Sequence, residues 1–412
     1  MKFLNMYNLK KICSSGLWVL FLVYFLPSLP AAQHIDIGEN IDFEYRFMER
    51  GNTRITQYRQ DINFYLEGYL KDNIEMGARL RSAGIMNSTA TVILYEGGKI
   101  ENLTPFIENA YVRIRDYYGY PVTFTFGKLA LNWQEGILIN DNRKGLPGVQ
   151  VEYTAPYGIE VEGYHIRTKM DRYGISDVRG TGLRADRDFD FRNVELNYTV
   201  EEYESTEEVI RRVYGGRFTR NIHQGLEYSL FGFLMEGEKG ADSFEGRALG
   251  AYGRFEGVVD PIGKGGAWIE YVFGSGDYDK NDDERSFRPV LSSVESNLIG
   301  DYYGRHREYA YMDGVKSDEI TLSHTIANLS SFRNALYATV LEDFHVFWIR
   351  STYKKVEPDL PLGGSITFGG TYNYSFIDFE LRYTKFSPED EYDYYTEDRS
   401  TEFITGSISA KF

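Results

Sequence analysis

The chain has 412 residues, of which 42% are hydrophobic and 16% aromatic, with 41 glycines and a single cysteine. A mean hydropathy of −0.41 excludes a polytopic helical membrane protein, because such a protein needs several apolar spans of roughly 20 residues. The formal net charge of −16 argues against nucleic-acid binding, which requires a basic surface.

Residues 1–32 are expected to form a secretory signal peptide. Three lysines among the first eleven residues precede an apolar core from Ile12 to Leu26, and a short exit ends at Ala32. A retained helical anchor is the alternative, but this apolar core is shorter than a bilayer requires. Removal of the peptide takes Cys13 with it and leaves 42 basic and 61 acidic residues, a net charge of −19.

From residue 33 onward, apolar and polar side chains alternate at period two, which predicts strands with one apolar and one polar face. Clear examples are the segments 41–48, 74–81, 110–115, 193–200 and 377–384.

Eighteen strands are predicted, with sixteen as the alternative count. They lie at 41–49, 54–69, 73–82, 107–116, 121–131, 148–155, 158–167, 189–200, 209–218, 225–235, 244–256, 266–274, 317–326, 334–342, 345–353, 362–373, 376–386 and 401–412.

The connections are expected to sort by length, with short turns in the periplasm and long loops outside the cell. The assignment conflicts at 275–316, which falls in the periplasm when strands are counted forward. Counted back from the C-terminus, the same loop falls outside, but the total becomes seventeen. We expect eighteen, because an even number keeps both termini in the periplasm. The predicted extracellular loops are 84–103, 132–147, 168–188, 275–316 and 387–400.

Alternation by itself fits a soluble sandwich as well as a membrane barrel, in which only alternate side chains face lipid. The last predicted strand, 401–412, keeps period two through Ile404 and Ile408 and ends on Phe412. This ending resembles the outer-membrane signature in which a terminal aromatic residue is read by the assembly machinery. With the signal peptide and the missing cysteines, it predicts one all-β domain over 33–412. That domain is a transmembrane antiparallel up-and-down β-barrel in the Gram-negative outer membrane.

Several short motifs resemble the alginate-export type of outer-membrane porin. The resemblance implies a monomeric barrel of eighteen strands with a basic lumen that passes an anionic polysaccharide. Lys128 stands where that family usually has Arg, and Arg288 where an Asp is common. The motifs are 127–128, 132–136, 271–277, 287–289, 303–304 and 362–388.

Charged members of the alternating pairs are expected to line the pore, since Arg or Lys facing lipid at mid-depth costs ~2–4 kcal/mol. Such a lining can guide carboxylated solutes through bidentate contacts. The alternative is that these cations pair with inward acids such as Glu75, Glu195, Asp378 and Glu380 and brace the wall. The predicted lining residues are Arg79, Arg81, Arg113, Arg115, Lys128, Arg211, Arg217 and Arg382.

We therefore expect a passive porin for small or polymeric, anionic solutes. Its expected partners are outer-membrane lipid and lipopolysaccharide, the barrel-assembly machinery and the solute in transit, with no nucleic acid. The alternative function is a closed barrel that acts as a surface adhesin or structural anchor. The acidic stretches 201–208 and 389–402, assigned to connections, suggest this alternative.

Neither an enzyme nor a cofactor is expected. No histidine lies in a serine-containing nucleophile elbow or an H-E-x-x-H run. Asp277, Asp279, Asn281 and Asp283 alternate as calcium ligands do, but Asp282 stands where a helix-loop-helix calcium site needs glycine. No metal site is predicted.

Overall fold

The computed structural model describes the strands and most of the tight turns of the chain. The predicted signal peptide and Phe412 lie outside the described residues. Within the described part, no helix is long and apolar enough to cross a membrane. The described ranges are 34–50, 53–88, 105–129, 131–133, 139–140, 145–168, 177–189, 192–204, 209–223, 225–240, 242–259, 263–276, 329–341, 343–356, 359–389 and 400–411.

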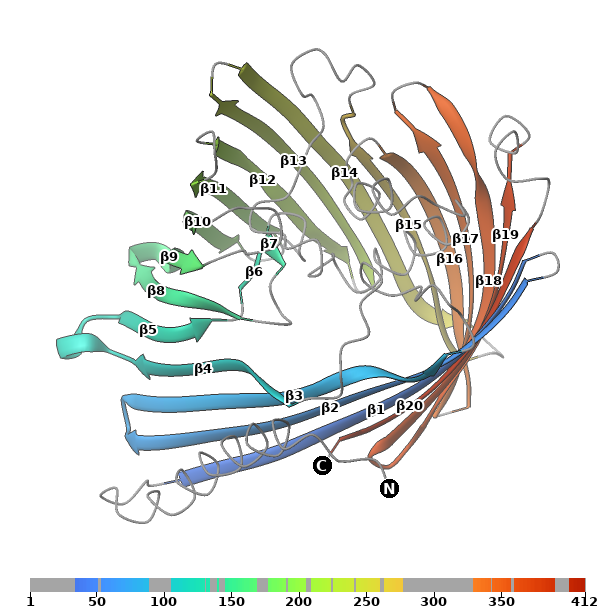
Figure 1. Cartoon of the computed structure of the whole chain (residues 1–412), viewed down its shortest axis with the longest axis horizontal. Helices are drawn as coiled ribbons and strands as arrows, with labels where there is room; N and C mark the ends of the chain where they lie inside the picture. Colours follow the sequence, from blue (N-terminus) through green and yellow to red (C-terminus); the bar gives the residue numbers. More distant parts are fainter. Residues whose placement is uncertain are drawn as a thin grey trace, which may run out of the picture.

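The strands form one closed antiparallel sheet of eighteen strands (Figure 1). Each strand pairs with its neighbours in chain order, and β1 pairs with both β2 and β20, which closes the ring. The predicted eighteen-stranded up-and-down barrel is confirmed. The ring consists of β1 (His34–Arg50), β2 (Thr53–Lys71), β3 (Ile74–Ser88), β4 (Phe106–Ile114), β5 (Val122–Leu129), β8 (Leu146–Ala155), β9 (Ile159–Thr168), β10 (Asp177–Phe189), β11 (Arg192–Glu204), β12 (Val209–His223), β13 (Leu226–Lys239), β14 (Asp242–Val259), β15 (Gly263–Gly274), β16 (Leu329–Leu341), β17 (Phe344–Lys355), β18 (Leu360–Tyr374), β19 (Ile377–Pro388) and β20 (Thr401–Lys411).

One predicted loop proves to be a strand. Strand β10 occupies most of 168–188, and it pairs with β9 and β11 over most of its length. Its lumen row carries Val178, Gly180 and Gly182 before Arg184, so the usual apolar and polar alternation is weak there. The predicted strand 317–326 lies outside the described residues, and the described ring closes without it. With β10 counted, the β15–β16 connection falls on the same side as the β3–β4 connection. Forward counting of the strands therefore places the loop after residue 274 on the extracellular side, and an even number of strands is kept.

The two faces of the sheet are inverted relative to a soluble protein. On β11, Leu196 is 61% exposed, whereas its neighbour Asn197 is 5% exposed. The row that carries Leu196 continues with Tyr198 and points outward, where lipid surrounds a membrane barrel. The row that carries Asn197 points into the ring, toward the short hairpin of β6 (Asn132–Trp133) and β7 (Ile139–Asn140), which Figure 1 shows inside the barrel.

The ring has a short-turn end and a long-loop end. The short-turn end carries tight connections such as β2–β3 and the 3-10 turns η3 (Tyr117–Gly119) and η5 (Pro156–Gly158). The first and last described residues lie at this end, where His34 pairs with Tyr69 and Lys411 N donates to Phe376 O at 3.1 Å. The β3–β4, β9–β10, β15–β16 and β19–β20 connections all leave from the opposite end.

Candidate functional site

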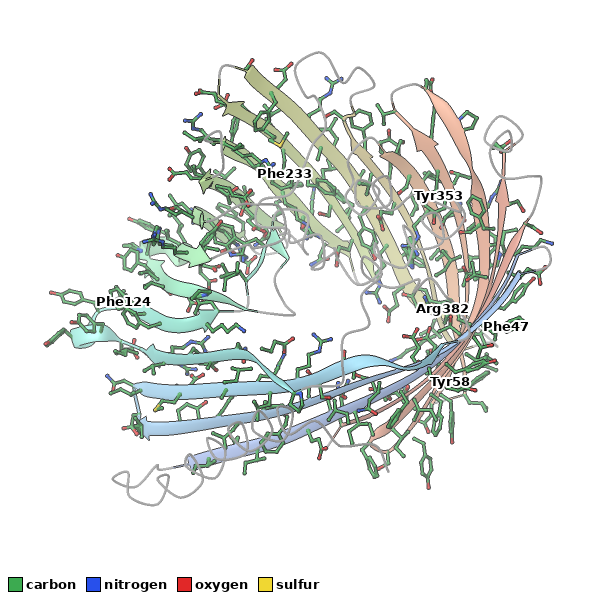
Figure 2. The ribbon with its side chains drawn as sticks, in the orientation of Figure 1. Phe47, Tyr58, Phe124, Phe233, Tyr353 and Arg382 are labelled. Atoms are coloured by element: carbon green, nitrogen blue, oxygen red, sulfur yellow. The ribbon has the colours of Figure 1, made fainter. Side chains whose placement is uncertain are left out.

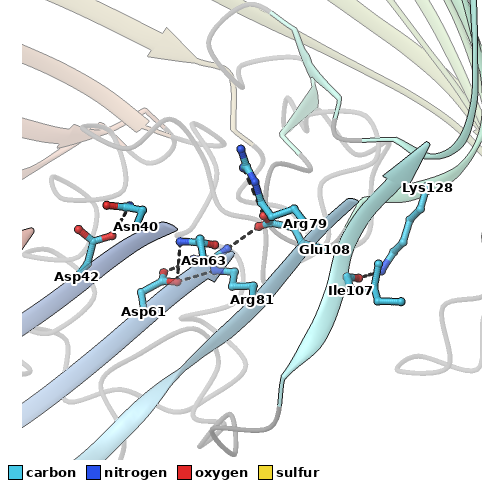
Figure 3. Close-up of polar contacts among 9 residues, drawn as sticks. All are labelled: Asn40, Asp42, Asp61, Asn63, Arg79, Arg81, Ile107, Glu108 and Lys128. Atoms are coloured by element: carbon cyan, nitrogen blue, oxygen red, sulfur yellow. Dashed lines mark hydrogen bonds and ion pairs between the residues drawn. The ribbon is translucent and has the colours of Figure 1, made fainter. Parts of the chain in front are cut away.

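A network of charges on the lumen side of β2, β3 and β4 is the best-defined polar site of the barrel (Figure 3). Arg81 lies at its centre and is about 10% exposed. Its Nε donates to Asp61 Oδ1 at 2.8 Å and its Nη1 to Glu108 Oε1 at 2.8 Å, while Nη2 also contacts Asp61. This guanidinium is therefore held between two carboxylates, one from each neighbouring strand.

A β-bulge brings Glu108 into this network. Arg79 pairs with Asn109 and Leu80 with Ile107, so Glu108 is the extra residue of β4. The bulge turns its carboxylate into the lumen, where it is 2% exposed. Arg79 Nη1 reaches Glu108 Oε2 at 3.4 Å but remains 44% exposed. The two arginines of β3 thus share one carboxylate yet differ sharply in their access to the lumen.

A second group of ion pairs is centred on Glu75 of β3. Its carboxylate binds Arg113 of β4 and Arg115, which follows the end of β4. Glu75 is 3% exposed, and Arg113 Nη1 lies 3.2 Å from Glu75 Oε1. Arg115 contacts the other oxygen and is 45% exposed. Tyr111 Oη also donates to Glu75 at 2.8 Å, and Arg113 Nε donates to Thr125 Oγ1 at 3.3 Å. The carboxylate lies behind the arginines rather than in front of them.

Because the carboxylates are buried and two of the arginines are exposed, the surface of the wall toward the lumen is positively charged. Glu75 and Glu108 are almost fully covered, whereas Arg79 and Arg115 are nearly half exposed. Four arginines meet three carboxylates in these ion pairs, and the exposed groups are N–H donors rather than acceptors. A solute that passes along β3 and β4 therefore meets a cationic, hydrogen-bond-donating face.

The remaining predicted arginines lie farther around the lumen. Arg211 Nη1 pairs with Glu201 Oε2 at 3.2 Å, and both side chains are buried. Arg217 Nε donates to Ser229 Oγ at 2.7 Å. Arg382 Nε donates to Glu380 Oε1 at 2.9 Å and stays 39% exposed. The wall thus contains arginines that brace neighbouring strands and arginines that reach the solvent.

Lys128 lies on the other face of the sheet. Lys128 pairs with Ala110 of β4 and Pro147 of β8. It lies two residues after the outward Phe126 on β5 and therefore points to the same side of the sheet. Its Nζ donates to the carbonyl of Ile107 at 2.6 Å, next to the bulge (Figure 3). The arginines of the predicted lining are therefore lumen-facing, and Lys128 differs from them because its position on β5 has the opposite parity.

The hairpin of β6 and β7 narrows the lumen, although its segment was predicted as part of the extracellular loop 132–147. Trp133 is 1% exposed and its Nε1 donates to Glu162 Oε1 at 2.9 Å. Its ring packs edge-on against Tyr164 with centroids 4.8 Å apart. Gln150 Nε2 donates to the same carboxylate oxygen of Glu162 at 2.8 Å. These contacts attach the hairpin to β8 and β9 from inside.

Apolar side chains surround this attachment in the long-loop half of the lumen. They come from the inward rows of β5, β8, β9 and β12 to β15, with Phe233 of β13 labelled in Figure 2, and Leu131 and Trp133 are added by the segment of the hairpin. Burial of this many large side chains inside the ring narrows the passage on that side. The cluster consists of Leu129, Leu131, Trp133, Leu146, Tyr164, Ile166, Val213, Phe233, Met235, Phe244, Ala248 and Val272.

Three lumen arginines whose side chains the structure describes were not among the predicted lining residues. Arg184 bridges Glu162, Asp186 and Glu195 with N–O distances of 3.5, 3.8 and 2.9 Å. It was missed because β10 was taken for a loop. Arg254 is 45% exposed, and its Nε donates to Tyr337 Oη at 3.3 Å.

Arg333 is buried and lies over the ring of Trp268. Arg254 lies within a predicted strand, where the alternation rule would have placed it inward. No group of three or more His, Cys, Asp or Glu side chains in the described strands is arranged to hold a metal ion.

Compared by sequence, the chain matches no family model and no curated protein. Compared by structure, it is similar to several proteins of Pseudomonas aeruginosa. OpdK, solved with vanillate, shares 9% identity at a TM-score of 0.56, over 92% of this chain and 99% of that chain. OccK9 (OpdG) shares 10% identity at a TM-score of 0.57 with the same coverage. OccK11 (OpdR) shares 10% identity at a TM-score of 0.55, over 92% of this chain and 96% of that chain.

At these identities the likeness concerns the fold. The shared fold is the eighteen-stranded barrel, and one of the similar structures is described as an outer membrane protein, so the predicted barrel architecture is confirmed. The similarity does not single out the alginate-export type.

Proposed function

We propose that the protein is a passive outer-membrane channel for small, carboxylated solutes. The observation that carries this proposal is the layered wall of β3 and β4, where the carboxylates of Glu75 and Glu108 lie behind the exposed Arg79 and Arg115. A guanidinium matches a carboxylate with two parallel N–H donors. Neighbouring acids weaken the attraction enough for a solute to leave again, which a channel requires.

The hairpin of β6 and β7 favours small solutes over a polymer. Trp133 holds it against the inner wall, so a polysaccharide would have to pass beside a fixed obstruction. One structural neighbour was solved with vanillate, a small carboxylate, which supports the same solute class. An alginate-like polymer is the finer proposal that the sequence motifs suggested, and it is tested beside the small solute.

The test measures the reversal potential of the purified protein in a planar bilayer with a salt gradient, which reports the preference for anions or cations. The wild-type channel is expected to be ohmic and to prefer chloride over potassium. Arg79→Gln with Arg115→Gln should lower that anion preference, because both exposed donors on the wall are lost. Vanillate and uronate oligomers, added separately, should reduce the current, vanillate at lower concentration.

Arg192→Gln with Arg247→Gln serves as the matched control. It removes the same charge from the outer face of β11 and β14 and should leave the selectivity unchanged. Cation preference in the wild type, without block by either carboxylate, contradicts the proposal.

The buried apolar cluster favours a second candidate, a closed barrel that acts as a surface anchor. It fills part of the long-loop half of the lumen, as an occluded pore would require. This candidate predicts negligible conductance, even after residues 134–138 are replaced by a short glycine linker. A measurable ohmic current from the intact protein rejects it.

A further inference from the structure

The outward face of β16 to β19 is hollowed near the long-loop end. The hollow has a volume of about 630 Å³ and combines three cationic side chains with hydroxyl and aromatic groups and one carboxylate, Glu389, at its edge. The outward rows of β16 and β19 carry apolar residues such as Leu336 and Leu381 farther from the long-loop end. Its main lining residues are Arg350, Lys354, Lys385, Tyr383, Phe368 and Ile366.

The register places the cations on the lipid side of the wall. Arg350 pairs with Ile366, and Ile366 pairs with Lys385, so the two charges flank one outward apolar residue. They stand two strands apart, about 10 Å between backbones, which long side chains can bridge to a single anionic group. Lys354 lies two outward positions closer to the long-loop end on β17, with Thr352 between it and Arg350, and is 52% exposed.

The lysines are partly neutralised, whereas Arg350 is not. Lys354 Nζ lies 2.5 Å from Asp359 Oδ1, and Lys385 Nζ lies 3.6 Å from Glu402 Oε1. Within the described part of the chain, Arg350 has an exposed side chain and makes no hydrogen bond or ion pair. An external anion would supply the missing acceptor at a position surrounded by Phe368, Ile366 and Tyr383.

A second hollow continues along the same face toward the short-turn end. It has a volume of about 540 Å³ and is almost entirely apolar. Gly370 and Leu381 line it, and each follows the first hollow by one outward position on β18 or β19. Gly406 and Tyr45 continue it across β20 and β1. Glycines in an outward row leave a groove where other strands carry large side chains.

We propose that this face binds a phosphorylated glycolipid of the outer leaflet, of the lipopolysaccharide type. The long-loop end of a membrane barrel lies on the extracellular side, so the cations stand at headgroup level. Arg350, Lys354 and Lys385 hold a phosphate, and an acyl chain lies in the groove over Gly370 and Gly406. The proposal concerns the outer surface and is independent of what passes through the lumen.

The first test measures binding of bisphosphorylated lipid A to the full barrel in detergent micelles by native mass spectrometry. Arg350→Gln, Lys354→Gln and Lys385→Gln together should weaken binding at least about tenfold, since all three basic groups that face the anionic headgroup are lost. Arg192→Gln, Arg220→Gln and Lys264→Gln together remove equal charge from the short-turn end and should leave binding unchanged. Equal loss in both triple variants, or in neither, overturns the proposal.

The source of the anion is tested with two further probes. Lipid A without its phosphates should bind wild type as weakly as bisphosphorylated lipid A binds the first triple variant. Inorganic phosphate at millimolar concentration should not displace bisphosphorylated lipid A. Displacement would reduce the site to a simple anion site and overturn the assignment to a lipid.

The apolar groove is tested with a separate variant. The proposal can then be tested even if the triple variant fails to fold. Gly406→Leu adds a side chain where the nearest atoms lie 4.0 Å from the new Cβ, and it should weaken lipid A binding by filling the groove. Gly253→Leu is the matched control on the outer face of β14, where no atom lies within 4 Å. Heat-modifiable gel migration confirms folding. Unchanged binding in Gly406→Leu contradicts an acyl chain in this groove.

Discussion

Individual arginines of this barrel differ in what surrounds them rather than in their sequence context. Arg79 and Arg81 belong to one strand and face the same lumen. Arg81 forms ion pairs with both Asp61 and Glu108, whereas Arg79 contacts one oxygen of Glu108 at 3.4 Å. A buried ion pair that loses one partner leaves an uncompensated charge, while an exposed pair contributes little. Arg81 is therefore expected to stabilise the wall, and Arg79 to meet the solute.

Replacement of Arg81 by Gln should destabilise the barrel by about 3–5 kcal/mol, because Asp61 and Glu108 would remain buried without their cation. Arg79→Gln should cost less than about 1 kcal/mol, since Arg79 is 44% exposed and Glu108 keeps its ion pair with Arg81. Urea unfolding of the refolded protein in lipid vesicles, followed by tryptophan fluorescence, gives both values. Equal costs for the two variants would mean that burial does not separate their roles.

Among the described elements, the β6–β7 hairpin lies inside the ring rather than in its wall. It is short, yet its one tryptophan makes a hydrogen bond to Glu162 and an edge-on contact with Tyr164. The bulge in β4 works on the opposite wall, where it turns Glu108 inward. Both irregular elements interrupt the regular barrel so that particular side chains project into the passage.

Trp133→Ala should release the hairpin from the wall and raise the single-channel conductance, with larger current fluctuations. Truncating a fully buried tryptophan costs about 3–5 kcal/mol, more than one short hairpin can recover from its other contacts. Trp133→Phe keeps the ring and loses only the N–H donor, so its conductance should lie between those of wild type and the alanine variant. A conductance for Trp133→Ala equal to that of wild type would show that the hairpin does not restrict the pore.

At the scale of the whole molecule, the even strand count determines the orientation. Eighteen strands return the chain to the side on which it started, so the short turns share one side with both ends of the described chain. Part of the acidic stretch 201–208, assigned to a connection, belongs instead to β11, where Glu201 is buried against Arg211. Some of the net negative charge is therefore neutralised inside the wall.

Cysteine labelling checks this orientation, since the mature chain is expected to lack cysteine. Gly240→Cys places a thiol at the exposed β13–β14 turn, and Tyr118→Cys places one in the η3 turn at the opposite end. In intact Gram-negative cells, a membrane-impermeant maleimide should label the first variant only, and both after permeabilisation. Labelling of Tyr118→Cys in intact cells would invert the barrel.

The sequence by itself determined the architecture. Period-two alternation is a local property of each strand, and an outward Leu196 beside an inward Asn197 can be read without knowing which strands are neighbours. The same rule located Arg79, Arg81, Arg113 and Arg115 on one face. It failed at β10, where glycines interrupt the alternation on the lumen face.

Only the tertiary structure decided which charges neutralise one another and which remain open to the lumen. Arg81 meets Asp61 and Glu108 across two strand boundaries, and the β4 bulge that allows this leaves no mark in the alternation. The attachment of Trp133 to Glu162 joins a connection to a strand 29 residues away. The hollow around Arg350 likewise exists only because three strands bring their outward rows together. These features depend on register and closure, which are set by the pairing of all eighteen strands rather than by any one segment.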